Sequence, residues 1–415
     1  MVLVFSGGRR AHLTARWRAL AVKLRRGLLP QKAQKAQITF YAQLSFVLFA
    51  PFCGPFIALV PRSMVASSVA INARQMGWLR GFSFDAVYIF GILGAALVSG
   101  WFVIANPNLF AAVFVVNGWL LGYHHVVSTY TRLTFDRDSF SEHRFLVLWL
   151  PFIVVAGVIA AWAVFGSWVL TTTYLYWQWW HYTRQSYGVS RIYGRKASLP
   201  INNTLTNLTV YAVPVWGILY RSYQAPEKYL FTEVKVFPVP FWLVAAAGSF
   251  AFIVTACWIW EQLKAFSEGR LAVAHTLYMC SHLAVFGAGY LLISDINHGW
   301  LVLNIWHNCQ YILTVWMFNN NRFKNQIDAR HRFLSHISQS KNVLSYFAAC
   351  LVISTVFYSA LATFLAWASP VVAVVTTLPL FAVVYQGINF HHYVVDAVIW
   401  KVRKKSLRQN LGIAN

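Results

Sequence analysis

Histidine side chains are the residues of this chain best suited to carry out chemistry. A neutral imidazole is the most common protein ligand for transition metals, and an ionisable side chain inside an apolar segment is costly enough that it usually has a function. The histidines concerned come from long apolar segments that are well separated in the sequence. They are His124, His125, His181, His275, His282, His307, His391 and His392.

Most of these histidines lie near those ends of their segments that are flanked by basic residues. His282 and His307 lie deeper, near the middle of two consecutive segments, and His298 lies on the opposite side. Histidines with purely structural roles would be spread over both sides. We therefore predict that these imidazoles converge on a metal site near one face of a membrane.

Two histidine pairs and one carboxylate refine this prediction. In the pairs His124–His125 and His391–His392 the two side chains point about 100° apart on a helix. The two histidines of a pair can therefore bind different metal ions, or one can bind an ion while the other supports a ligand of that ion. If the helix continues, Asp396 lies one turn after His392 on the same face. A carboxylate in that place would orient and polarise the imidazole that binds the metal.

The number of ions stays open at this point. His275 and His282 share a helix face but lie two turns apart, about 10 Å by helical rise, which is too far for one ion and suits a site with two. Imidazole nitrogens suit iron, copper or zinc. We favour iron, because an imidazole cluster embedded in lipid is well suited to activate oxygen.

Aromatic and basic residues beside these histidines are candidates for substrate binding. Tyr123, Trp180 and Tyr393 are expected to wall a site that admits an apolar chain from the membrane. Arg184 follows His181 by about one turn and is expected to bind an anionic head group or an acidic redox partner.

Long apolar stretches must carry these residues, and ten of them are long enough to cross a hydrocarbon core. Of the 415 residues, 58% are hydrophobic and 11% are charged. We predict an all-α, polytopic membrane bundle over residues 62–400, with no room for a soluble domain. The apolar segments are 86–105, 109–130, 145–165, 167–184, 203–220, 239–261, 271–293, 300–318, 343–367 and 370–393.

Basic residues alternate between the connections of these segments. The short connections at 106–108, 166, 294–299 and 368–369 contain no lysine or arginine, whereas the loops between them carry several. Residues 221–237, with three basic and two acidic residues, are a mild exception on the outer side. The positive-inside rule then predicts ten crossings with both termini cytoplasmic, in a bacterial inner membrane.

Three segments near the ends of the chain lie outside the predicted bundle. Residues 1–38 form a basic cytoplasmic segment, expected to lie on anionic lipid as an interfacial helix; a transit peptide is the alternative. Residues 39–61 are interrupted between Pro51 and Pro55, which favours a re-entrant hairpin over a kinked eleventh crossing. Residues 401–415 form a basic cytoplasmic tail.

Charge and cysteine usage exclude two other classes of function. The chain has 34 Lys and Arg against 11 Asp and Glu, a formal net charge of +23. Because these residues flank apolar segments, orientation and anionic lipid explain them, and nucleic-acid binding is rejected. The five cysteines lie in apolar segments without paired spacing, which argues against a disulfide framework or a thiolate zinc site.

The histidine pairs near segment ends resemble the histidine boxes of membrane di-iron desaturases, hydroxylases and alkane oxygenases. That family uses His-x3-His and His-x2-His-His, and only the adjacent pairs are present here. Single histidines on many helices resemble the membrane β-carotene dioxygenase family. The patterns His-x-x-Arg-Gln-x-Tyr-Gly (181–188) and Trp-His-Asn-x-Gln-Tyr (306–311) are similar to uncharacterised bacterial membrane proteins, a resemblance that implies no activity.

These observations predict a metal-dependent membrane oxidoreductase that oxidises a lipophilic substrate with dioxygen. An electron-donor protein and membrane lipids are the other expected partners. Two alternatives stay open. A transporter or proton-coupled carrier would use membrane histidines and Asp396 as a relay, and a haem protein would use histidines that face each other across the bundle.

Overall fold

The computed structural model describes residues 76–197, 199–401 and 405–413. Contacts along the chain divide these residues between a large unit, residues 73–264 and 270–415, and a second unit that includes residues 265–269. The large unit is mostly helical. The predicted segments 1–38 and 39–61 lie outside the described residues.

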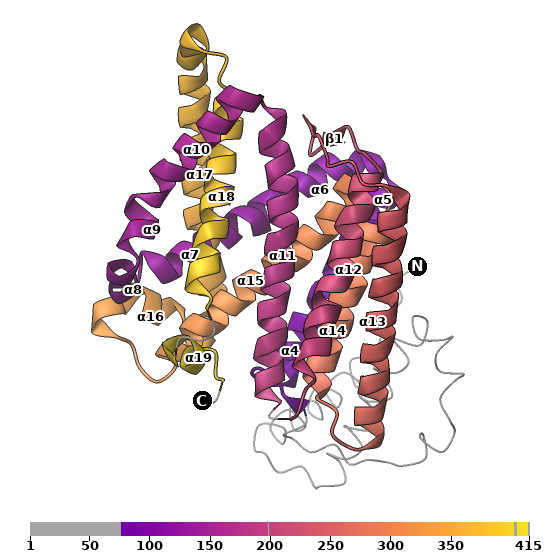
Figure 1. Ribbon diagram of the computed structural model, residues 1–415. Helices are drawn as coiled ribbons and strands as arrows, with labels where there is room; N and C mark the ends of the chain where they lie inside the picture. The colour runs from indigo at the N-terminus through magenta and orange to yellow at the C-terminus, as the bar shows by residue number, and fades with distance from the viewer. Residues whose placement is uncertain (1–75, 198, 402–404, 414–415) are drawn as a thin grey trace, which may run out of the picture. The chain divides into compact units, whose positions relative to one another are not determined.

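Nearly all of the first half of this unit is helical (Figure 1). The π-helical and 3₁₀ turns are given the label η in the text. In chain order the elements are α4 (Phe82–Ala86), η2 (Val87–Gly91), α5 (Ile92–Ala105), η3 (Pro107–Leu109), α6 (Phe110–Asn117), η4 (Gly118–Tyr123), α7 (His124–Leu133), α8 (Arg137–Glu142), α9 (Arg144–Leu148), α10 (Leu150–Phe165), α11 (Trp168–Lys196) and α12 (Asn203–Tyr223).

A short antiparallel hairpin separates this half from the next, pairing Lys228 with Glu233. The remaining elements are β1 (Lys228–Tyr229), β2 (Thr232–Glu233), α13 (Phe241–Ser267), α14 (Val273–Gly287), η5 (Ala288–Leu292), α15 (Ile296–Phe323), η6 (Ala329–His331), α16 (Arg332–Ile337), η7 (Ser340–Asn342), α17 (Val343–Val375), α18 (Leu380–Ile399) and α19 (Lys405–Asn410).

Each of the predicted apolar segments coincides with one of these helical stretches, but one boundary was wrong. The connection predicted at 368–369 is helical, because α17 continues through Pro370 to Val375. The chain turns at residues 376–379 instead, and Pro379 is the N-cap residue of α18. Pro370 lacks only its own N–H donor, a loss that an already long apolar helix tolerates.

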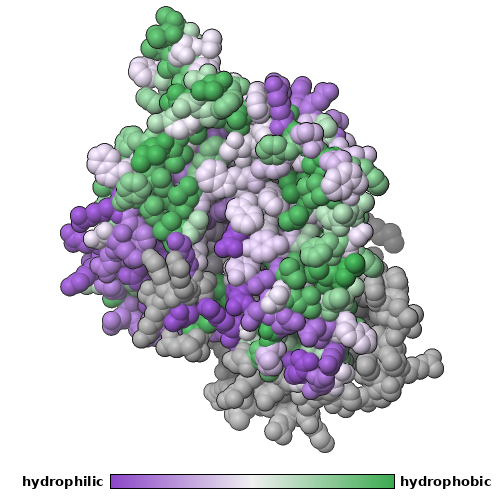
Figure 2. Space-filling view, viewed as in Figure 1, coloured by the Kyte–Doolittle hydropathy of each residue, from purple (hydrophilic) through white to green (hydrophobic). Residues whose placement is uncertain are grey.

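Among the described residues, four helical stretches are long and apolar enough to cross a membrane: 82–105, 107–133, 241–267 and 340–375. Their most apolar windows are only 22–33% buried inside the protein, so most of this apolar surface faces outward. Figure 2 shows hydrophobic residues over α10 and α17, and hydrophilic residues gathered over α8 and α16. An integral membrane protein accounts for outward apolar surface on this scale.

The connections of the helices gather at two ends of the unit. In Figure 1 the β1–β2 hairpin, the α10–α11 turn and the α17–α18 turn lie at the upper end. The short helices α8, α16 and α19 and the C-terminal end of α11 lie at the lower end. The turn at the upper end between α10 and α11 depends on Gly166, whose φ of 85° is strained for other residues.

The long helix α15 packs against α5, α7 and η5, and it begins where Asp295 accepts hydrogen bonds from the N–H groups of Asn297 and His298. Its first turn approaches η5 so closely that a Cβ on Gly299 would overlap the carbonyl oxygen of Gly289. This close packing holds α15 beside the helices that carry the other histidines.

Candidate metal centre

Three imidazoles and one carboxylate meet inside the helical unit. His125 comes from α7, His181 from α11, and His392 and Asp396 from α18. One ligand atom of each side chain lies within 4.8 Å of the others, and all four side chains are buried. His125 and His392, 267 positions apart in the chain, are thus brought together with His181, and Asp396 lies one turn after His392 on α18.

The facing atoms of this group are the Nε2 atoms and one carboxylate oxygen. Nε2 of His125 lies 2.6 Å from Nε2 of His392. Oδ2 of Asp396 lies 3.4 Å from Nε2 of His392 and 3.8 Å from Nε2 of His181. Ligands held at about 2.0–2.2 Å from one ion lie about 3–4 Å apart, so small side-chain adjustments would place these atoms around a single ion.

A fourth imidazole, His307 of α15, borders this group. Its ring centroid lies 4.9 Å from those of His125 and His181. The backbone carbonyl of His307 accepts a hydrogen bond of 3.0 Å from Gln185 Nε2, which ties α15 to α11 at this level. His307 is therefore placed to become a further ligand or to line the site.

A chain of hydrogen bonds fixes the proton on His392. Asp396, as a carboxylate, accepts the hydroxyl proton of Tyr311 at 2.7 Å, and Tyr311 accepts the indole N–H of Trp400 at 3.1 Å. With its one proton used, Tyr311 must accept from Thr129, 2.7 Å away, so Thr129 in turn accepts from Nδ1 of His392 at 3.3 Å. Nδ1 then carries the proton, and the Nε2 lone pair faces the site.

Several imidazole nitrogens of this group have no hydrogen-bond partner among the described residues. They are Nδ1 of His125, Nε2 of His181 and Nδ1 of His307, and all three are buried. A buried polar atom left in this condition costs on the order of 1–3 kcal/mol, so such atoms usually have a reason. At Nε2 of His181, a bound metal ion would supply the partner.

Aromatic rings hold the imidazoles in place. Tyr311 stacks on His125 with ring centroids 4.0 Å apart, and Tyr393 stacks on His181 at 4.4 Å. Tyr182 packs on His307 at 4.2 Å. Rings that are stacked on one face have few orientations left, which preorganises the donor atoms.

The donor set suits one borderline transition-metal ion. Neutral imidazoles and a single carboxylate carry one negative charge, which complements a divalent or trivalent cation. Two histidines and one carboxylate are the ligands of non-haem iron oxygenases, and the present group contains that set with one further imidazole. A second ion would need further carboxylate or imidazole ligands beside the group.

No family model, no curated protein and no solved structure matches this chain.

Two of the other predicted ligands are bonded elsewhere. Nε2 of His391 lies 2.7 Å from the carbonyl oxygen of Leu146. Both ring nitrogens of His282 are engaged, Nδ1 with Ser186 at 2.7 Å and Nε2 with the carbonyl oxygen of Val210 at 3.0 Å. These contacts link neighbouring helices, and they leave His282 without a free lone pair for a metal.

The last two predicted ligands also lie outside the group. His124 packs edge-on against Phe347, with ring centroids 5.8 Å apart. His275 contacts Ser190 at 3.2 Å through Nε2 and lines a separate cavity. The structure therefore brings together one ion's ligands from α7, α11 and α18, and it does not bring His275 and His282 to a second ion there.

The predicted substrate residues fall in different places. Tyr393 is buried against His181, whereas Trp180 is 45% exposed. Arg184 donates to the Tyr211 hydroxyl at 2.5 Å and lies over Trp180 on the outer face of α11. Tyr123 stacks on Tyr358 of α17 at 3.8 Å.

Thr129, Tyr311 and Trp400 belong to the site without having been assigned to it from the sequence. Thr129 follows His125 by four residues, and Tyr311 follows His307 by four. A spacing of four places two side chains on one helix face, one turn apart, so this signal could have been found. Trp400, which follows the last residue of α18, donates to Tyr311.

A second group, Asp136, Asp138 and His331, also has ligand atoms within 4.8 Å of one another. Asp136 is an ion-pair partner of Arg322 and caps α8, and Nε2 of His331 lies 3.2 Å from it. The arginine already balances this carboxylate. His331 and His143 lie between the predicted apolar segments, and both are buried.

Proposed function

We propose that this protein is an integral membrane oxidoreductase in which one non-haem iron ion, bound by His125, His181, His392 and Asp396, oxidises a lipophilic substrate with dioxygen. The observation that carries the proposal is the convergence of these four buried side chains on one point. Such a group, buried between apolar helices, is costly to keep without a ligand.

Non-haem iron fits the geometry better than haem. A porphyrin needs its axial ligands on opposite sides of an open plane. Here the ligand atoms lie within 4.8 Å of one another, and Asp396 stands beside the imidazoles rather than away from them. A compact ion satisfies all of these atoms, whereas a macrocycle would have to pass between them.

The supporting residues suit oxygen chemistry. Iron would supply the activation of dioxygen, and the protein would hold its ligands and manage protons. The hydroxyl of Tyr311, shared with Asp396, and that of Thr129 form a path along which a proton can be held beside the site.

The electron balance defines the partners. Hydroxylation breaks one C–H bond, places one oxygen atom in the substrate and reduces the other to water, which consumes two electrons and two protons. Desaturation removes two hydrogen atoms and forms two waters with the same two electrons. An electron-donor protein must deliver them, whereas oxidative cleavage that keeps both oxygen atoms needs no donor.

The surroundings favour a substrate that arrives from the lipid. Tyr393, which covers His181, packs against Trp177 at 5.8 Å, and Trp177 stacks on Phe390 at 5.1 Å. These rings would contact a fatty acyl, isoprenoid or carotenoid chain. The basic residues at the lower end suit an anionic membrane surface, in keeping with ten crossings and cytoplasmic termini in a bacterial inner membrane.

Lipid and pigment profiles of cells test this proposal. Cells would express the wild type, His392→Gln or His391→Gln, with and without air, and protein levels would be matched by immunoblotting. His391→Gln is the control because His391 is the neighbouring buried histidine outside the group.

We expect an oxidised product with the wild type and with His391→Gln in air, and its loss with His392→Gln or without oxygen. Identical profiles for the wild type and His392→Gln in air would contradict the proposal.

A further inference from the structure

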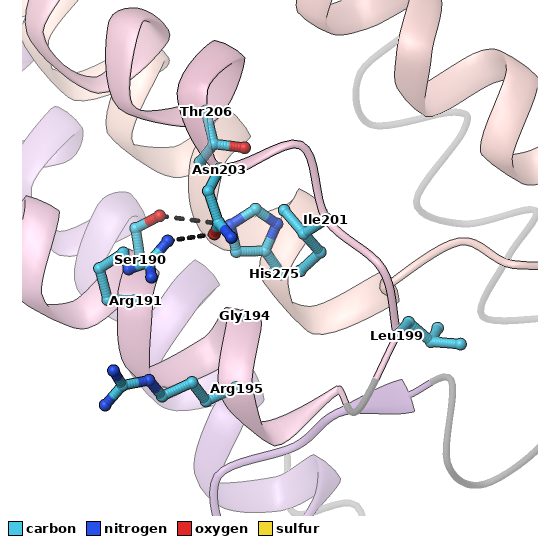
Figure 3. Close-up of a pocket in the computed structure, with 9 residues that line it drawn as sticks. All are labelled: Ser190, Arg191, Gly194, Arg195, Leu199, Ile201, Asn203, Thr206 and His275. Atoms are coloured by element: carbon cyan, nitrogen blue, oxygen red, sulfur yellow. Dashed lines mark hydrogen bonds between the residues drawn. The ribbon is translucent and has the colours of Figure 1, made fainter.

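A second site lies in a cavity of about 330 Å³ between α11 and the first turns of α12 and α14 (Figure 3). Ser190, the first lining residue on α11, follows His181 by nine residues, which is about 14 Å along the helix. The cavity is therefore separate from the candidate metal centre, and a ligand there is independent of the proposed function.

The lining of this cavity is basic and polar. Arg191 and Arg195 of α11 are among its lining residues, and Ser190 and Thr206 contribute hydroxyls. The guanidinium of Arg191 lies beside Asn203, whereas that of Arg195 extends away from His275 in Figure 3. Arg191 also donates to Oδ1 of Asn203, which holds its guanidinium toward α12. No carboxylate is among the residues that line the cavity in the described part of the chain. This charge repels cations and attracts anions.

A buried imidazole points into the same space. His275 is 2% exposed, its Nε2 lies 3.2 Å from Ser190 Oγ, and its Nδ1 has no hydrogen-bond partner among the residues described. If Ser190 donates to Nε2, Nδ1 carries the proton and can donate to an anion. A bound anion would then provide the partner that this buried nitrogen lacks.

Two helices begin at the cavity. Asn203 and Thr206 belong to the first turn of α12, and His275 belongs to the first turn of α14. The N-cap residue of α14 is Ala272, whose methyl side chain cannot accept a hydrogen bond from the first N–H groups of the helix. The partial positive charge of both helix N-termini thus adds to that of the two arginines.

We propose that this cavity binds a phosphate group, either free or in the head group of an anionic phospholipid. The guanidinium of Arg191, the hydroxyl donors and one imidazole are groups that a tetrahedral oxyanion uses, and the exposed Arg195 adds positive charge at the same cavity. The volume accommodates the phosphate of a head group, and a basic pocket between apolar helices is a site of the kind that binds such lipids.

Binding to the purified, detergent-solubilised full-length protein tests the proposal. Inorganic phosphate would be measured by equilibrium dialysis, and retained phosphatidylglycerol by mass spectrometry. The variants are Arg195→Gln, which alters an exposed side chain and should not disturb folding, and His275→Gln. Arg330→Gln, an exposed arginine outside the cavity, removes the same charge elsewhere.

We expect saturable binding of at least one probe, weakened about tenfold by each cavity variant and unchanged in Arg330→Gln, since each lost contact is a charge-assisted hydrogen bond. Binding of phosphatidylglycerol alone would identify a membrane lipid, and binding of both probes a phosphate site open to either source. Failure of both probes to bind saturably, or equal weakening in Arg330→Gln, would overturn the proposal.

Discussion

The proton on His392 is set by residues that do not touch the proposed ion. The donors run in one direction, from Nδ1 of His392 to Thr129, from Thr129 to Tyr311 and from Tyr311 to the Asp396 carboxylate. The indole N–H of Trp400 also donates to Tyr311. Because each hydroxyl has only one proton, this direction leaves the Nε2 lone pair free for a metal. Partners of this kind raise metal affinity by orienting the ligand.

Thr129→Val tests this chain of hydrogen bonds. Valine keeps the size and β-branching of threonine but cannot accept from Nδ1, so His392 loses its preference for the metal-binding tautomer. We expect metal affinity to fall by about 10- to 100-fold, measured by competition with a chelator. Thr129→Ser keeps the hydroxyl and is expected to stay close to the wild type; equal affinity in all three proteins would contradict the assignment.

Pairs of residues four apart organise the site at the scale of the helix. His125 and Thr129, His181 and Gln185, His307 and Tyr311, and His392 and Asp396 each contribute a ring and a polar group one turn later. In each pair the second residue bonds to another part of the same site. Helix packing must hold these pairs in register, and the contact between α15 and η5 is the tightest of those involved.

Gly299→Ala tests that contact. A Cβ at this position would overlap the Gly289 carbonyl oxygen, so α15 must shift away from η5. We expect a loss of stability of about 1–3 kcal/mol, as in other overpacked interiors, seen as a lower Tm in detergent. Gly94→Ala is the matched control, because no atom lies within 4 Å of its added Cβ. An unchanged Tm in Gly299→Ala would show that the helices do not pack this closely.

The sequence predicted the positions of the helices better than it predicted which histidine side chains meet at the site. Hydrophobic stretches and basic loops located each helical segment, and the α17–α18 boundary failed because Pro370 is tolerated inside a long apolar helix. His125, His181 and His392 were predicted ligands, but so were His282 and His391. Nothing in the sequence shows that the carbonyl groups of Val210 and Leu146 engage those two rings, since that depends on helix rotation and packing.

At the scale of the whole molecule, two ends differ in charge and composition. The β1–β2 hairpin lies at one end, and the short helices α8 and α16 lie at the other (Figure 1). The segment that leads into α16 carries Arg322, Lys324 and Arg330. By the positive-inside rule, we expect the basic end to face the cytoplasm. The candidate centre and the phosphate cavity then both belong to helices that end on that side.

Cysteine labelling tests this orientation. In a variant whose five native cysteines are replaced, Glu227→Cys in the hairpin and Ser340→Cys after α16 would each carry a single thiol. Both positions are exposed, so access depends on the side of the membrane. We expect a membrane-impermeant maleimide to label position 227 in intact cells and position 340 only after permeabilisation; labelling of both from the same side would contradict the topology.

The metal content of the purified protein tests the central claim most directly. Elemental analysis of the wild type, Asp396→Asn and the control His391→Gln, purified in detergent without chelators, should give about one iron per chain in the wild type and the control. Asp396→Asn should lose most of it, because the site then lacks its only negative ligand. Metal-free wild-type protein that still converts its substrate, or equal metal content in all three proteins, would contradict the claim.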